Sequence, residues 1–153
     1  MALYSLGVIA PNLGVGVFVT YTNQPLLEIK AGATDAPRLM EIEIQGEGSL
    51  SSSVMVMGRT TSMGTPKLFQ NPIPLDPNSP PSPISIITDW VVPPGMPSQF
   101  LRRVSLSALA SLFRGRVVFP SGLSLSPSSS IGLWVSGSAS ASAVMNVNVE
   151  CDW

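Results

Sequence analysis

The chain has 153 residues, no histidine, one cysteine, 11% charged residues and a formal net charge of −1. This length suits a single domain over residues 1–153 with one hydrophobic core. The absence of histidine excludes Ser-His-Asp and Cys-His catalytic pairs and histidine metal ligands, and the low charge gives no field that attracts nucleic acid. We therefore expect a non-enzymatic protein without cofactor or metal, whose weakly charged surface contacts other protein.

The N-terminal segment from Met1 to Ala10 is apolar, but no Lys or Arg precedes Lys30 and Pro11 interrupts the segment. A secretory signal needs a positively charged start, so we expect none here. No uncharged run is long and apolar enough for a membrane span, and we expect no membrane partner. Cys151 has no second cysteine to pair with, so the fold needs no oxidising compartment, and we expect synthesis in a reducing cytoplasm.

Alternation of apolar and polar residues with a period of two is the dominant pattern. Between Leu39 and Ile44 it places Met40 and Ile42 on one face of a strand and Glu41 and Glu43 on the other. Nine segments are predicted to be strands, which indicates an antiparallel β-sandwich or barrel: 15–21, 26–29, 39–44, 54–57, 84–90, 100–106, 116–119, 131–135 and 143–150.

Seven prolines lie between Thr60 and Pro83. Proline cannot donate a ladder hydrogen bond, so this segment is not a central strand, and we predict an extended excursion over residues 60–83. It is either an arm that lies on a partner or a surface loop packed on its own domain. The candidate contact residues in it are Pro72, Pro74, Leu75 and Pro77.

The segment from Gln99 to Arg114 fits both a strand and a helix, because its apolar residues match both periods. We predict a strand through Leu106 followed by a short helical turn from Ala108 to Phe113; one continuous helix is the alternative. Farther along, the small residues from Ser136 to Ser142 predict a hairpin loop, or else a close contact between subunits.

Four of the eight basic residues are clustered in the sequence: Arg102, Arg103, Arg114 and Arg116. If Arg102 and Arg103 lie on a strand, their side chains point to opposite faces and cannot form one patch. The acidic isoelectric point near 5.2 argues against nucleic-acid binding. Solvated strand ends are the preferred interpretation of these arginines, and ion pairs with an acidic partner or a neighbouring subunit are the alternative.

Two further groups of residues have both a functional and a structural interpretation. Glu41 and Glu43 could form a glycosidase pair, but two carboxylates on a solvated strand face are the preferred interpretation. Trp90, Trp134 and Trp153 could stack against sugars in a carbohydrate-binding module, although core or interface packing is preferred for each. Trp134 lies on the strand face opposite Ile131, Leu133 and Val135, so it would be exposed if those three residues line the core. Trp134 and Trp153 are also candidate protein contacts.

Three stretches carry a resemblance to a known class of proteins: Phe100-Leu-Arg-Arg-Val-Ser-Leu, Arg116-Val-Val-Phe-Pro-Ser-Gly-Leu and Ser130-Ile-Gly-Leu-Trp-Val. They resemble the C-terminal half of small jelly-roll proteins of tailed bacteriophages, including capsid decoration (cement) proteins, and the opening from Leu3 to Leu13 is similar in style. The resemblance implies an all-β, antiparallel jelly-roll-like β-sandwich that oligomerises on the outside of a phage head. It implies no catalytic residues.

From the composition and this resemblance together we expect a virion protein on the capsid surface. Its expected partners are the major capsid protein, whose neighbouring subunits it would bridge, and itself, as a homodimer or homotrimer. Two alternatives remain: a carbohydrate- or receptor-binding module of a head or tail fibre, and a minor structural protein of the tail.

Overall fold

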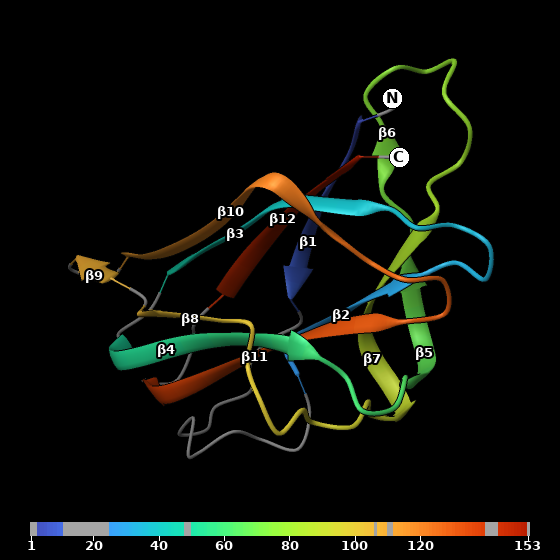
Figure 1. Ribbon diagram of the computed structural model, residues 1–153. Coiled ribbons are helices and arrows are strands. Elements are labelled where there is room, and N and C mark those ends of the chain that lie inside the picture. Colours follow the sequence, from blue (N-terminus) through green and yellow to red (C-terminus); the bar gives the residue numbers. More distant parts are fainter. Residues whose placement is uncertain are drawn as a thin grey trace.

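The computed structural model describes residues 3–10, 25–47, 50–105, 107–109, 112–139 and 144–152. Every regular element among them is a strand, and two antiparallel sheets lie over each other in a sandwich-like arrangement (Figure 1). The strands are β1 (Leu3–Ala10), β2 (Leu27–Ala31), β3 (Arg38–Glu47), β4 (Leu50–Arg59), β5 (Thr65–Gln70), β6 (Ile73–Pro74), β7 (Ile84–Val92), β8 (Arg102–Ser105), β9 (Ser107–Leu109), β10 (Leu112–Ser124), β11 (Ser130–Ala139) and β12 (Val144–Asp152). The all-β prediction is therefore confirmed.

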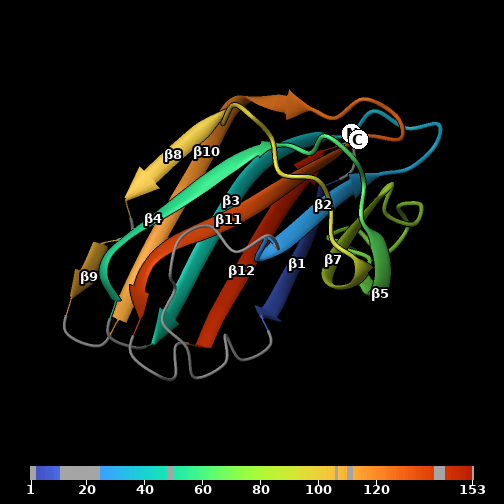
Figure 2. The ribbon, with the colours of Figure 1, turned by 90° about the horizontal axis from the view of Figure 1, so that it is seen from below.

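The strands pair in a nested order. The first sheet runs β6-β1-β12-β3-β10-β9 and the second runs β5-β7-β2-β11-β4-β8. Strand β1 pairs with β12, β2 with β11, β3 with β10 and β4 with β8, so each early strand meets a late one. From β1 to β4 the chain passes from one sheet to the other at each step, and Figure 2 shows these strands layered over one another.

The core lies between the two sheets and is built from alternate residues of the central strands. In the second sheet Ile29 is the backbone partner of Ile131, and Leu133 stands between Leu27 and Met57. Burial of such side chains supplies about 1.5–3 kcal/mol each. The buried apolar residues include Leu27, Ile29, Leu39, Ile42, Met55, Met57, Ile84, Ile86, Val117, Ile131 and Leu133.

The alternation in β3 breaks at Met40. The register with β12 shifts here, because Glu41 pairs with Glu150 whereas Leu39 pairs with the next residue, Cys151. Met40 is thus the extra residue of a β-bulge, and the residues before it change face. Leu39 is buried and Met40 is only half-buried. The prediction that Met40 shares the core face with Ile42 was therefore wrong.

The predicted helical turn from Ala108 to Phe113 was also wrong. Ala108 in β9 is the backbone partner of Phe113 in β10, and Leu109 is the partner of Leu112, so these residues form antiparallel strands. Strand β10 also pairs along most of its length with β3, and the paired residues are 65 to 86 positions apart in the chain. This long-range pairing decides between two periods that the local sequence fits equally well.

The other predicted strands overlap strands of the structure, except for 15–21, which lies outside the described residues. The hairpin loop predicted from Ser136 to Ser142 was wrong for its first part. Ser136 and Ser138 lie in β11 and pair with Val54 and Ser51 of β4, and Ala139 ends the strand. The remainder of that stretch is outside the described residues.

The proline-rich segment from Thr60 to Pro83 contains two edge strands. β5 pairs with β7 at the end of the second sheet, and β6 pairs with β1 at the end of the first. Neither is a central strand, in keeping with the prolines. In Figure 1 this green segment lies along one side of the sandwich, so it connects the edges of both sheets.

Candidate functional site

A buried carboxylate organises the outer face of the second sheet. Glu28 in β2 is 0% exposed. Its Oε1 accepts a hydrogen bond from Ser130 Oγ at 2.6 Å, and its Oε2 accepts one from Trp90 Nε1 at 2.9 Å. The backbone N–H of Gly64 donates to both oxygens, at 3.1 and 3.3 Å. Three donors from three different parts of the chain therefore converge on one side chain.

The network around Glu28 also fixes the start of the proline-rich segment. Because Ser130 Oγ donates to Glu28, the 2.5 Å contact between Thr60 Oγ1 and Ser130 Oγ is a hydrogen bond in which Thr60 donates. Gly64 approaches Trp90 so closely that a Cβ atom on it would lie 2.4 Å from Trp90 Cδ1. The carboxylate is enclosed and fully engaged, so its role is to hold the chain between β4 and β5 against the sheet.

Trp134 is 1% exposed, in keeping with the preferred interpretation of core packing, so it is not accessible as a protein contact. It does point to the outer face of the sheet, but a further layer of chain covers that face. Phe100 meets its ring edge-on, with 6.3 Å between the ring centroids. The indole lies over Gly132, where a Cβ atom would come within 2.3 Å of Trp134 Cη2. Gly58 in β4 is the backbone partner of Gly132, and a Cβ atom on Gly58 would lie 2.6 Å from Cγ of Pro97. The missing side chain of Gly58 therefore leaves room for Pro97.

The tryptophans therefore offer no platform for sugars among the described residues. Trp90 is 8% exposed and donates its indole N–H to Glu28, and Trp134 is enclosed. Trp153 lies outside the described residues. Trp134 Nε1 is buried and has no hydrogen-bond partner in the described part of the chain.

Two of the four clustered arginines form ion pairs within the domain. Arg116 contacts Glu41 through two hydrogen bonds, Nε to Oε1 at 2.9 Å and Nη2 to Oε2 at 2.6 Å. Arg114 Nε donates to Glu43 Oε1 at 2.5 Å. Both glutamates are thus held by cations on the outer face of the first sheet, which supports the structural interpretation of the Glu41–Glu43 pair.

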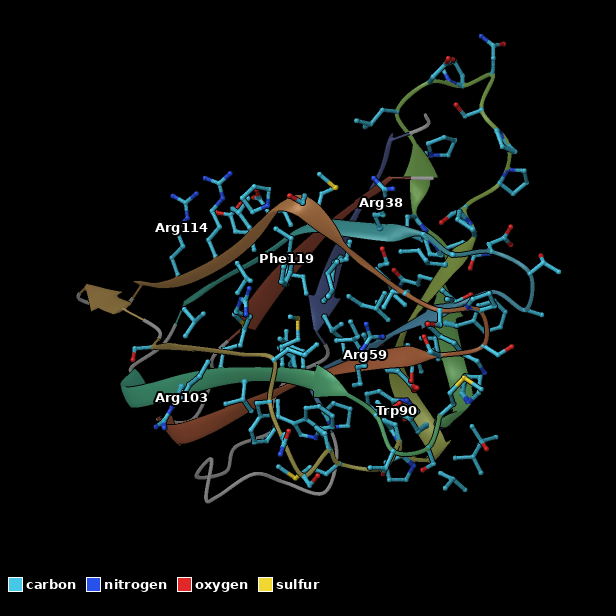
Figure 3. All side chains as sticks on the ribbon, viewed as in Figure 1. Arg38, Arg59, Trp90, Arg103, Arg114 and Phe119 are labelled. Atoms are coloured by element: carbon cyan, nitrogen blue, oxygen red, sulfur yellow. The ribbon has the colours of Figure 1, made fainter. Side chains whose placement is uncertain are left out.

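The other two arginines lie on opposite faces of β8, as predicted. Arg102 faces the first sheet, and its guanidinium carbon lies 5.7 Å from the centre of the Phe119 ring. Arg103 points away on the other side of the strand (Figure 3). Both side chains are exposed. The structure thus does not bring the four arginines together into one patch.

The ion pair of Arg116 with Glu41 should add little stability, because Arg116 is 55% exposed and water screens the charges. A double-mutant cycle with Arg116→Ala and Glu41→Ala should give a coupling free energy of about 0.5–1 kcal/mol in urea unfolding. In 1 M NaCl, where the Debye length is about 3 Å, the coupling should fall. A coupling that is larger and independent of salt would contradict this assignment.

The candidates in the proline-rich segment differ in accessibility. Pro72 is buried and is no contact residue, whereas Pro74 is half-buried and Pro77 is exposed. Leu75 is 64% exposed. Sequence reasoning missed three exposed apolar neighbours, which are Leu68 (55%), Phe69 (57%) and Ile73 (68%). The available signal was the absence of alternation: β5 carries adjacent apolar residues between Lys67 and Gln70, so one strand face cannot bury both.

Among the described residues no group of His, Cys, Asp and Glu side chains is arranged to hold a metal ion. No helix there has the length and hydropathy of a membrane span. A scan against protein-family models, a search of curated proteins and a search of solved structures each found no match to this chain.

Proposed function

We propose that this protein is a non-catalytic virion protein that binds the outside of a tailed-phage capsid and bridges neighbouring major capsid subunits. We also propose that its fold is a jelly roll. The nested pairing of β1 with β12, β2 with β11, β3 with β10 and β4 with β8 supports this, since a rolled-up antiparallel hairpin pairs its strands in that order. Viral capsid domains are a frequent use of jelly rolls.

The observation that carries the proposal is an apolar ridge on the proline-rich segment. We use the name apolar ridge for Leu68, Phe69, Ile73 and Leu75, four large side chains that are each more than half exposed. They lie within eight consecutive positions at one side of the sandwich. Exposed apolar residues that are close together mark protein contact sites, whereas single ones need no explanation.

The apolar ridge is held in place before any partner binds. Strand β5 is hydrogen-bonded to β7, β6 is hydrogen-bonded to β1, and Gly64 is bonded to Glu28. The segment is thus a fixed surface rather than a free arm. A surface that is already ordered loses little conformational entropy on binding, which favours attachment to a rigid shell. Repetition over the shell would multiply modest contacts if this chain forms the proposed dimer or trimer.

The test is binding to capsids made from the encoding genome after deletion of this chain. The double variant Ile73→Ser/Leu75→Ser should bind at least about tenfold more weakly in cosedimentation, because burying two such side chains supplies more than the 1.4 kcal/mol that a tenfold change requires. Its melting temperature should stay close to that of the unmodified protein, since both residues are exposed.

The matched control is Val91→Ser/Val118→Ser, which removes two exposed apolar side chains outside the apolar ridge. This control should bind capsids like the unmodified protein. Equal binding by the ridge variant and the unmodified protein would overturn the proposed contact, and failure of the unmodified protein to bind these capsids would overturn the proposed function.

A further inference from the structure

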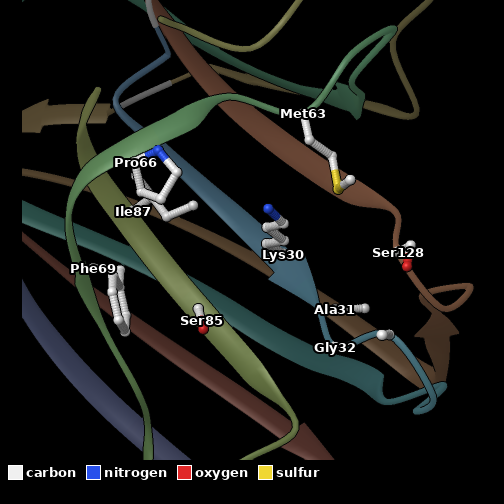
Figure 4. A pocket seen from close by; sticks show the side chains of 10 residues that line it. Lys30, Ala31, Gly32, Met63, Pro66, Phe69, Ser85, Ile87 and Ser128 are labelled. Carbon is white, nitrogen blue, oxygen red and sulfur yellow. The ribbon is translucent and has the colours of Figure 1, made fainter. Parts of the chain in front are cut away.

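The outer face of the second sheet contains a cavity of about 410 Å³ beside the apolar ridge. Strands β2 and β7 form its floor and β5 forms one wall, while Met63 closes the opposite side from the chain that precedes β5 (Figure 4). This volume falls within the range of roughly 300–1,000 Å³ that is typical of small-ligand sites. The residues are far apart in the sequence and meet only because the proline-rich segment folds over the sheet.

Lys30 stands in the middle of this cavity. In Figure 4 its side chain rises from β2 between Phe69 and Pro66 on one side and Met63 and Ser128 on the other. The side chain is half-buried. In the part of the chain that the structure describes, no carboxylate forms an ion pair with Lys30.

The other lysine of the chain provides a contrast. Lys67 is exposed, and its Nζ lies 3.2 Å from Asp89 Oδ2. The carboxylate of Glu28 shares the strand and the outer face with Lys30, but its oxygens accept hydrogen bonds from Gly64, Trp90 and Ser130. Lys30 is thus a half-buried cation with no ion-pair partner among the described residues, which makes the cavity complementary to an anion.

The walls determine the rest of the ligand chemistry. Most of the lining is apolar, from Met63, Pro66, Phe69 and Ile87. The hydroxyl groups come from Ser128 and from Ser85, whose Oγ donates to Asn71 Oδ1 at 3.0 Å. A single lysine is a compact point charge, unlike the arginine fork that binds phosphate in a bidentate manner. One charge beside apolar walls and an aromatic ring suits a singly charged group on a flat apolar body.

We propose that this cavity binds a small carboxylate with an aromatic or short aliphatic body, with the carboxylate on Lys30 and the body against Phe69 and Pro66. The inference goes beyond the proposed function, because it needs no capsid and is tested on the isolated protein.

The experiment is a titration followed by ¹H–¹⁵N NMR, with phenylacetate as the probe and its neutral isostere phenylacetamide as the comparison. Phenylacetate should shift the amide signals of Ala31, Gly32 and Ser85, and phenylacetamide should bind at least about tenfold more weakly, because it lacks the charge. Lys30→Met should remove this preference while leaving the protein folded. The matched control Lys67→Met should retain it.

A second variant tests the aromatic wall of the cavity independently of Lys30. Phe69→Ser should weaken phenylacetate binding and leave a preference for the acid over the amide, because Lys30 remains in place. Equal binding of acid and amide, unchanged binding by Lys30→Met, or shifts confined to residues away from the cavity would each overturn the proposal. Absence of binding by both phenylacetate and hexanoate would also overturn it.

Discussion

Replacing Glu28 with alanine is expected to lower the free energy of unfolding by about 3–5 kcal/mol, a large part of the roughly 5–15 kcal/mol that a domain has. The substitution leaves the buried indole N–H of Trp90 and the N–H of Gly64 without an acceptor, and it opens a void in a site that is 0% exposed. Urea unfolding followed by tryptophan fluorescence measures this loss.

Two comparison variants show whether the loss of stability in Glu28→Ala comes from the buried hydrogen-bond network. Glu28→Gln keeps the volume but turns one acceptor into a donor that faces Ser130 or Trp90, so we expect a smaller loss of about 1–2 kcal/mol. Glu41→Ala removes a glutamate from another strand, where the ion pair is partly exposed, and should cost no more than about 1 kcal/mol. If Glu28→Ala were as stable as Glu41→Ala, the buried network would not hold the fold together.

Replacing Gly132 with alanine is expected to lower the free energy of unfolding by about 2–3 kcal/mol. The new methyl group would lie 2.3 Å from Trp134 Cη2 and 2.6 Å from Cζ3, closer than atoms can approach. The indole is enclosed and packs against Phe100, so it has little room to move away. Thermal or urea unfolding measures the effect.

A double-mutant cycle separates this clash from a general effect of alanine in a strand. In the Trp134→Ala background the ring is gone and the methyl group of Gly132→Ala has space, so the same substitution should cost at least about 1 kcal/mol less. Additive effects of Gly132→Ala and Trp134→Ala would show that the indole does not occupy the space over Gly132.

Local alternation was enough to predict most strands, because a half-buried strand must alternate wherever one face meets the core. It failed at Met40, where a bulge adds one residue, and from Ala108 to Phe113, where the apolar spacing fits two periods. In both places the outcome depends on pairing with strands that are distant in the sequence, which a local pattern does not contain.

Among the site residues, too, some positions follow from the local sequence and others depend on contacts with distant segments. The opposite faces of Arg102 and Arg103 follow from strand geometry and could be predicted. Glu28 could not, because an alternating glutamate predicts a solvated side chain, and its donors lie 36, 62 and 102 positions away in the chain. Trp134 was assigned to the correct face, but its burial involves Phe100, which packs against the indole from another segment of the chain.

The most direct test of the proposed function is the number of copies of this chain per particle in any virus particles purified from its source, counted by quantitative mass spectrometry. A protein that bridges capsid subunits over the whole shell should be present in roughly as many copies as the shell has equivalent sites, on the order of hundreds. A handful of copies would contradict the capsid assignment and place the chain in the tail or a fibre, and complete absence would contradict a virion role.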